Sequence, residues 1–215
     1  MALKFYPAKH NSIFIWIWQH LSFIELSTKI KLNIIPSEIK VLSSISPTNS
    51  LILIANHSDE LDPRVCMELS RRSGRRFTFM ANSEIYKEWF GIARWCLQYI
   101  GSFSVERGAQ DHQAIRYAIN TVKSGKEILI LFPEGEIYNL NEMVQPFKTG
   151  VAHIGLDALK EITATSSDRS VCILPVAIKY RYQKNIGSTL KKRIIRMEQH
   201  LSMRSNVLDM RNELY

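Results

Sequence analysis

Short apolar runs alternate with amphipathic segments along the chain. Four apolar runs read as buried strands, at residues 51–55, 77–80, 127–132 and 171–178. Between them lie segments with the pattern of helices, at residues 63–73, 83–99, 110–124 and 149–162. Continuous apolar strands that alternate with helices indicate a sheet covered on both faces. We therefore expect a single-domain α/β fold in which a mixed sheet is flanked by helices.

Two of the predicted helices are bounded by residues that are typical of helix ends. Asp62-Pro63 is typical of a helix start, because Asp accepts from free amides and Pro fits the first turn. Gly125 is typical of the residue that ends a helix in the left-handed conformation. In the segment 83–99 the apolar residues indicate a broadly buried helix or, alternatively, one that lines an apolar tunnel or touches a membrane. They are Trp89, Phe90, Ile92, Trp95 and Leu97.

A Trp-containing apolar stretch precedes the first predicted strand, at residues 13–18. The chain has no run of 18 apolar residues, so we expect no transmembrane helix. No small-residue cleavage site follows the stretch, and a secretory signal therefore fits poorly. Residues 11–30 are either a helix in a membrane interface, where Trp rings prefer to lie, or a helix whose aromatic face packs on the domain.

The last segment, residues 187–215, predicts a helix with one apolar stripe and many cations elsewhere. It is either a basic surface helix or part of an oligomer contact. We divide the chain into an N-terminal membrane-interface segment (1–38), a central domain (39–182) and a basic C-terminal helix (183–215).

Composition and charge narrow the class of protein. The chain has 215 residues, 46% hydrophobic and 22% charged, which excludes a disordered or fibrous protein. Its net charge of +8 favours anionic partners such as nucleic acid, lipid headgroups, phosphorylated substrates or acidic proteins. The three cysteines are scattered, which argues against a disulfide framework or structural zinc.

The first candidate site follows the strand at 51–55. His57 and three acids, Asp59, Glu60 and Asp62, lie within six positions. The carboxyl end of a strand in an open α/β sheet is where ligands bind. Asp62 could hold one imidazole nitrogen of His57 and leave the other to take a proton from a hydroxyl. The alternatives are a helix cap at Asp62 with His57 as a turn residue, or a divalent metal bound by the four side chains.

Three further segments carry candidate residues. Arg107 follows a short strand flanked by glycines at 101–108, and Arg suits a phosphate because its planar fork donates in pairs. Glu134 and Gly135 form a turn after an apolar strand, where Gly allows a close approach to the backbone. Lys148 precedes a helix start and could meet an anion. Each segment also has a plain interpretation. Residues 101–108 could be an edge strand with a solvated Arg107 paired to Glu106. Glu134 and Gly135 could form an ordinary turn, and Lys148 could be a solvated side chain.

The segments NHSDELD, GSFSVER, FPEG and the proline-containing ILPVAI occur in that order over residues 50–180. This order resembles the four-block pattern of the glycerolipid acyltransferases, the family of 1-acylglycerol-3-phosphate acyltransferases. The resemblance makes 39–182 an acyltransferase domain with a glycerol-3-phosphate acyltransferase-like fold. It implies His57 as the general base, Asp62 as its orienting partner, and Arg107, Glu134 and Gly135 as residues that shape the acceptor site; we add Lys148 to the expected substrate-binding residues.

The expected reaction moves a fatty acyl group from acyl-CoA or acyl-acyl carrier protein to a lysophospholipid hydroxyl. No metal and no cofactor beyond this co-substrate is implied. The expected location is the cytoplasmic face of a membrane, as a peripheral or monotopic protein. Glu136-Ile137-Tyr138 replaces the Thr-Arg-Ser that often follows FPEG. A negative charge there works against a phosphate-bearing acceptor, so another lysolipid or polar lipid is the alternative acceptor.

Three competing functions have less support. A serine hydrolase lacks its Gly-x-Ser-x-Gly elbow here. A non-catalytic lipid- or acyl carrier-binding module has no need of the His57–Asp62 spacing. A nucleic-acid binder is suggested only by the charge and by the arginines at 71–76, which no recognition motif accompanies; we expect no nucleic acid among the partners.

Overall fold

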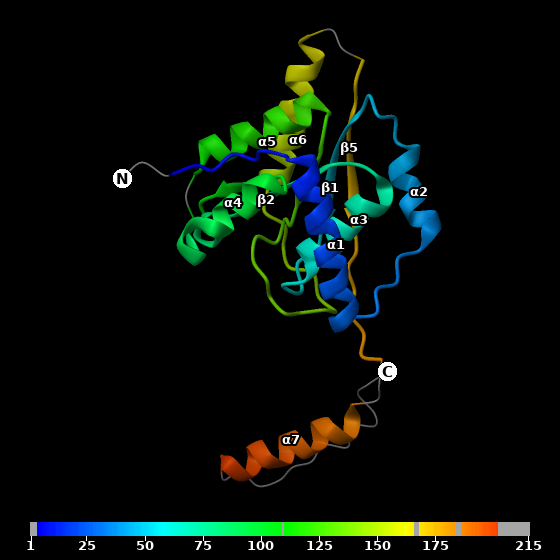
Figure 1. The fold of residues 1–215 in the computed structure, drawn as a ribbon, viewed down its shortest axis with the longest axis vertical. Helices are drawn as coiled ribbons and strands as arrows, with labels where there is room; N and C mark the ends of the chain where they lie inside the picture. Colours follow the sequence, from blue (N-terminus) through cyan, green and yellow to red (C-terminus); the bar gives the residue numbers. More distant parts are fainter. Residues whose placement is uncertain (1–3, 109, 166–167, 184–185, 202–215) are drawn as a thin grey trace. The chain divides into compact units, whose positions relative to one another are not determined.

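A five-stranded parallel sheet organises the chain (Figure 1). The computed structural model describes residues 4–108, 110–165, 168–183 and 186–201. The strands lie in the order β3-β2-β4-β1-β5. Their bounds are β1 (Ser50–Ala55), β2 (Phe77–Asn82), β3 (Ser102–Val105), β4 (Ile128–Leu131) and β5 (Val171–Val176). The expected α/β sheet flanked by helices is confirmed, but every recorded pairing is parallel, so the prediction of a mixed sheet is wrong.

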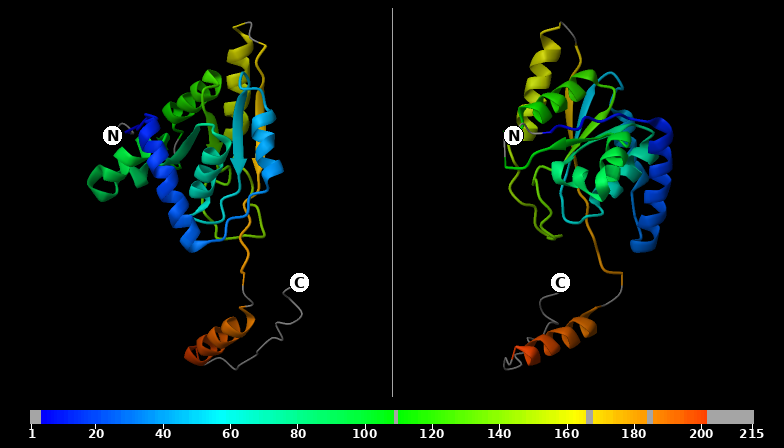
Figure 2. Two further views of the ribbon diagram at one scale, coloured as in Figure 1. Left: turned by 45° about the vertical axis from the view of Figure 1, so that its right-hand side comes forward. Right: turned by 60° about the vertical axis from the view of Figure 1, so that its left-hand side comes forward.

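Helical crossovers explain the parallel pairing. The connections contain α3 (Asp62–Ser73), α4 (Ile92–Tyr99), α5 (His112–Ser124) and α6 (Gly150–Thr163). From β1 to β3 the chain moves one way across the sheet, and from β3 to β5 it moves back. Because such crossovers are right-handed, α3 and α4 cover one face, while α5 and α6 cover the other (Figure 2). The direction reverses between the adjacent strands β1 and β4.

Small residues on α5 allow close packing against the middle of the sheet. Ala114 and Ala118 are fully buried and pack with Ile52 of β1 and Leu129 of β4, which are also fully buried. Gly125 ends α5 with φ of +66°, as the sequence predicted. This core holds β1 and β4 rigidly at the centre of the sheet.

The edge strand β5 contains Pro175, which pairs with Ile54 of β1. Proline has no N–H to donate, and an edge strand needs ladder bonds on one side only. The predicted edge or bulge position of this proline is therefore confirmed as an edge.

The N-terminal helix α1 (Ser12–Lys29) has two apolar faces. Ile15 and Leu26 are buried on the face that packs against α3, to which Glu25 is tied by an ion pair of 2.7 Å with Arg64. The opposite face is exposed and carries Ile13, Ile17, Leu21 and Ile24. The short helix α2 (Pro36–Ser44) also contacts α3. Among the described residues, no helix combines the length and apolar character needed to cross a bilayer.

The segment 83–99 is not the continuous buried helix that was one of its interpretations. It consists of the 3₁₀ turns η1 (Ser83–Lys87) and η2 (Trp89–Gly91), followed by α4. Phe90, at φ of +52°, breaks the helix. The rings of Phe90 and Trp95 are exposed, and Trp95 meets Phe14 of α1 edge-on at 4.9 Å between ring centroids. Apolar residues of this segment therefore extend the exposed apolar surface of α1.

Contacts divide the chain into two units, residues 1–178 and 179–215. Within the second unit, α7 (Gly187–His200) forms part of the predicted helix over 187–215. The rest of that prediction, from residue 202 onward, lies outside the described residues.

Candidate active site

The pairing of β1 with β4 brings two sequence-predicted blocks together. Ile54 pairs with Leu131, so the same register continued by three residues sets His57 opposite Glu134. The backbone N–H of His57 donates to Oε1 of Glu134 at 2.8 Å. These residues lie at the carboxyl ends of the two strands between which the winding of the chain reverses. In open α/β sheets this switch point is where a crevice for ligands forms.

His57 and Asp62 form a hydrogen-bonded pair. The distance from Nδ1 of His57 to Oδ2 of Asp62 is 3.0 Å, and Asp62 is fully buried at the first turn of α3. Oδ2 also accepts from the backbone N–H of Asp59 at 2.9 Å, which fixes the carboxylate. A carboxylate only accepts, so Nδ1 of His57 carries the proton and Nε2 of the neutral ring has a free lone pair.

Phe132 stacks against one face of the His57 imidazole. The two rings are stacked, with centroids 4.2 Å apart and an angle of 24° between their planes. The ring of His57 is therefore held at one edge by Asp62 and on one face by Phe132. Sequence analysis placed Phe132 in its block without assigning it this function, because an aromatic residue at a strand end is commonly a core residue.

Glu134 uses its carboxylate within the protein. Oε1 accepts from His57 N–H, and Oε2 accepts from the backbone N–H of Gln145 at 3.1 Å. Its side chain is buried. The predicted substrate-binding residue thus ties the loop after β1 to the loop that leads into α6, and it shapes the site through these two loops.

Gly135 and Lys148 lie against each other. Gly135 has φ of +79°, and a Cβ on it would collide with Nζ and Cε of Lys148. The backbone N–H of Lys148 donates to the carbonyl of Pro133 at 2.8 Å. The missing side chain of Gly135 therefore leaves room for the side chain of the exposed Lys148 to lie against this turn.

Asn56 fixes the residue before His57, a function that sequence analysis missed. Its Oδ1 accepts from the backbone N–H of Ile178 at 2.7 Å, and its Nδ2 donates to the carbonyl of Ile178 at 2.9 Å. This two-bond contact joins the end of β1 to the chain just beyond β5. The signal in the sequence was an Asn directly after a strand, a residue type that often bonds to nearby backbone.

Arg107 also lies beyond the carboxyl end of a strand, but farther from His57. It is exposed in the turn after β3, and β2 and β4 separate β3 from β1. Three strand spacings correspond to about 14 Å. The neighbouring Glu106 accepts from the hydroxyl of Ser83 at 2.5 Å, and the structure records no ion pair between Glu106 and Arg107 among the described residues. Arg107 therefore does not adjoin His57, and its contact with a substrate stays a prediction.

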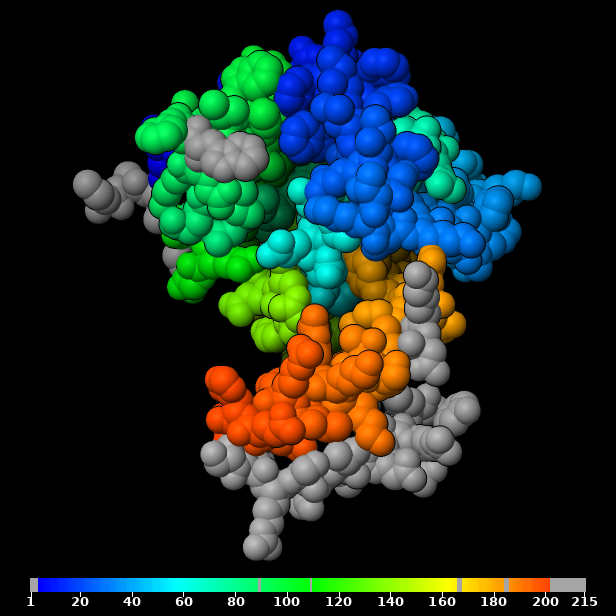
Figure 3. Space-filling view, turned by 60° about the horizontal axis from the view of Figure 1, so that its bottom comes forward, coloured from blue at the N-terminus to red at the C-terminus, as the bar shows by residue number. Residues whose placement is uncertain are grey.

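The segments that follow β1 and β4 reach the surface on one face of residues 1–178 (Figure 3). Figure 3 shows the segment after β1 (cyan) beside the loop after β4 (yellow-green). The cyan segment surfaces between α1 (blue) and the segment that contains α4 (green). In this view the segment after β1 therefore lies between two elements that carry exposed apolar side chains.

Two other residues near His57, Asp59 and Cys66, have partners or surroundings within the protein. Asp59 accepts from the backbone N–H of Leu61, and no three His, Cys, Asp or Glu side chains in the described part of the chain gather as a metal site. Cys66 lies near Asp62, but burial, reinforced by the charge of Asp62, raises the pKa of its thiol far above neutrality. It is therefore a protonated core residue rather than a thiolate.

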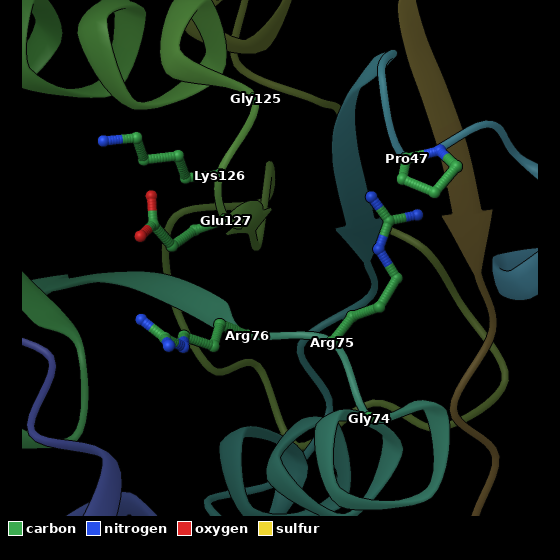
Figure 4. A pocket seen from close by; sticks show the side chains of 7 residues that line it. All are labelled: Pro47, Gly74, Arg75, Arg76, Gly125, Lys126 and Glu127. Atoms are coloured by element: carbon green, nitrogen blue, oxygen red, sulfur yellow. The ribbon is translucent and has the colours of Figure 1, made fainter.

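A cavity of about 450 Å³ lies at the opposite end of the strands, where β2 and β4 begin. Arg76 and Lys126 point to the same side as Glu127, while Arg75 points away from them toward Pro47 (Figure 4). Because its cations diverge and a carboxylate lies among them, this cavity is not a convergent anion site.

The other arginines of the segment 71–76 are also used within the protein. Arg71 and Arg72 both donate to Glu68. These pairings leave little support for the nucleic-acid interpretation of this cluster.

This geometry defines a class of protein. Its members are α/β domains with a His–Asp pair at the switch point of a parallel sheet. A family model described as Acyltransferase matches residues 37–179. Over 139 residues the chain is 28% identical to a Streptococcus pneumoniae (strain ATCC BAA-255 / R6) protein named 1-acyl-sn-glycerol-3-phosphate acyltransferase, covering 65% of this chain and 49% of that protein. The match thus spans about half the length of that relative. The chain belongs to the acyltransferase family.

Replacing Glu134 tests its internal function. We expect Glu134→Ala to lower the free energy of unfolding by about 2–4 kcal/mol, because two backbone N–H groups lose a charged acceptor. Glu136→Ala, at an exposed neighbouring position, should change it by less than about 0.5 kcal/mol. Urea denaturation of both variants measures this difference, and equal stability of the two would contradict it.

Proposed function

We propose that this protein transfers a fatty acyl group from an acyl thioester to a hydroxyl of a lysophospholipid. The observation that carries the proposal is the His57–Asp62 pair, in which Nδ1 donates to the carboxylate and Nε2 is left as the nitrogen that can accept a proton. Family membership supports the same class of reaction. The printed name of the pneumococcal relative supports 1-acylglycerol-3-phosphate as the acceptor.

In the proposed reaction, His57 is the general base. Nε2 takes the proton of the acceptor hydroxyl as its oxygen attacks the thioester carbonyl. The tetrahedral intermediate then expels the thiolate, which takes the proton back from the imidazolium. Asp62 stabilises the imidazolium through the Nδ1–H bond and keeps the ring oriented. No side chain is acylated, because the substrate hydroxyl is itself the nucleophile.

Two cations beyond the carboxyl ends of the strands support the proposal that the acceptor has an anionic headgroup or that the donor carries phosphates. Lys148 lies against Gly135 in the turn that follows β4, and Arg107 lies after β3, which β2 and β4 separate from β1. Glu136, also exposed, adds a negative charge to this edge. Lysophosphatidate is therefore the proposed acceptor, and a lysolipid with a cationic or neutral headgroup is the alternative. The donor is acyl-CoA or acyl-acyl carrier protein.

Replacing His57 tests the proposed base. We expect His57→Ala to lower turnover by about 10²–10⁴-fold, the usual contribution of a general base. Asp62→Asn should also lower it, because an amide can turn its N–H₂ toward Nδ1 and favour the wrong tautomer. The matched control is His153→Ala, on the exposed surface of α6, which should retain full turnover. A folded His57→Ala protein with unchanged turnover would exclude this assignment.

We also propose that the exposed face of α1 binds the membrane surface that holds the acceptor. Ile13, Ile17, Leu21 and Ile24 recur on this face at the spacing of one side of a helix. The aromatic cluster formed by Phe14 and Trp95 joins it to α4. Apolar faces of this kind, bordered by Trp, are typical of helices that lie in the bilayer interface. The location is thus peripheral, at the face of the membrane where thioester donors are found.

A paired substitution on α1 tests this surface. We expect Ile17→Asp with Ile24→Asp to lower binding to uncharged phosphatidylcholine vesicles by about 10–100-fold, because two apolar side chains no longer enter the interface. The control is Leu156→Asp on α6, since Leu156 is 58% exposed and Ile24 is 60% exposed. Vesicle co-sedimentation measures both. Equal binding of the α1 variant and the control would contradict the proposal.

A further inference from the structure

The second unit contains a helix whose two sides differ sharply. On α7, an apolar stripe recurs at intervals of four, three and four residues, the spacing of one helical face, and consists of Leu190, Ile194, Met197 and Leu201. Met197 and Leu201 are 63% and 65% exposed. None of the residues Gly187–His200 is buried. Within the described part of this unit, no buried core covers the apolar stripe of α7, in which Leu190 and Ile194 are half-buried.

The polar side of α7 is strongly basic. Lys192 and Arg196 project from the side opposite the stripe, and Lys191 and Arg193 flank it. Glu198 is the single acid among the residues of α7, against these four cations. Long basic side chains beside an apolar stripe can bury their stems and keep their charges in a polar layer.

These features fit a lipid surface better than a second copy of the helix. Pairing two stripes would bring Lys191 and Arg193, which flank the stripe, close to the same cations of the partner. An anionic bilayer offers an apolar interior for the stripe and negative headgroups for the cations. A helix of 14 residues is also marginal in water by itself and gains stability at such an interface.

We propose that α7 is an anionic-lipid-binding helix, a second membrane contact that is independent of α1 and of the acyl-transfer reaction. Its occupant is a bilayer surface rich in anionic phospholipid headgroups. Binding through two contacts, each weak alone, holds a peripheral protein on a membrane firmly.

The experiment compares full-length variants on two kinds of vesicle. The α7 variant carries Lys192→Gln, Arg193→Gln and Arg196→Gln, which keep the apolar stripe. The control carries Arg116→Gln, Lys126→Gln and Lys160→Gln, which remove the same charge from other parts of the surface. Vesicles consist of phosphatidylcholine alone or with about one third phosphatidylglycerol. Turnover in detergent micelles, which needs no bilayer, is measured in parallel.

We expect the α7 variant to lose about 100-fold in binding to the anionic vesicles, since each Lys or Arg near such a surface contributes about fivefold. Its binding to phosphatidylcholine and its turnover in micelles should not change, and the control should lose much less. Undiminished anionic binding by the α7 variant would overturn the proposal. It would also be overturned by a wild-type dimer in solution that Ile194→Asp dissociates, because the stripe would then be covered by a second copy. If the wild type and both variants all lack turnover while these differences in vesicle binding persist, the result contradicts the proposed acyl-transfer reaction and not the lipid binding by α7.

Discussion

The parallel pairing of β1 with β4 is the constraint on which the candidate site depends. Its register sets His57 opposite Glu134, and the buried carboxylate of Glu134 holds both adjoining loops by their backbone N–H groups. The two strands lead to helices on opposite faces of the sheet, so the chain diverges just beyond them. The His57–Asp62 pair lies where that divergence leaves the edge of the sheet open.

Much of the fold and site could be predicted from the sequence, for identifiable reasons. Continuous apolar runs mark buried strands, and the spacing from His57 to Asp62 spans one loop and the first turn of a helix. Continuous apolar runs are typical of parallel strands, but a sheet covered on both faces can also carry an antiparallel edge strand, which is why a mixed sheet was expected. The internal bonds of Glu134 could not be predicted either, because its partners are main-chain groups that every residue carries.

Exposed apolar residues explain the other errors. A pattern of Phe, Ile and Trp in 83–99 looks the same whether a helix is buried or lies at an interface. The structure separates these cases, since Phe90 interrupts the helix and leaves its ring in solvent, while Trp95 contacts Phe14 of α1. Apolar surface beside an open strand edge suits a protein whose proposed acceptor resides in a bilayer. The charge of +8 then has a plain use at anionic headgroups.

The measurement that most directly tests the central claim follows both products of the proposed reaction. Purified protein is given a long-chain acyl thioester with and without lysophosphatidate, and free thiol, acylated lipid and free fatty acid are quantified by mass spectrometry. The account predicts thiol release that requires the acceptor and equals the acylated lipid formed. Thiol release without acceptor, with fatty acid as the sole acyl product, would contradict it, because His57 would then activate water instead of a lipid hydroxyl.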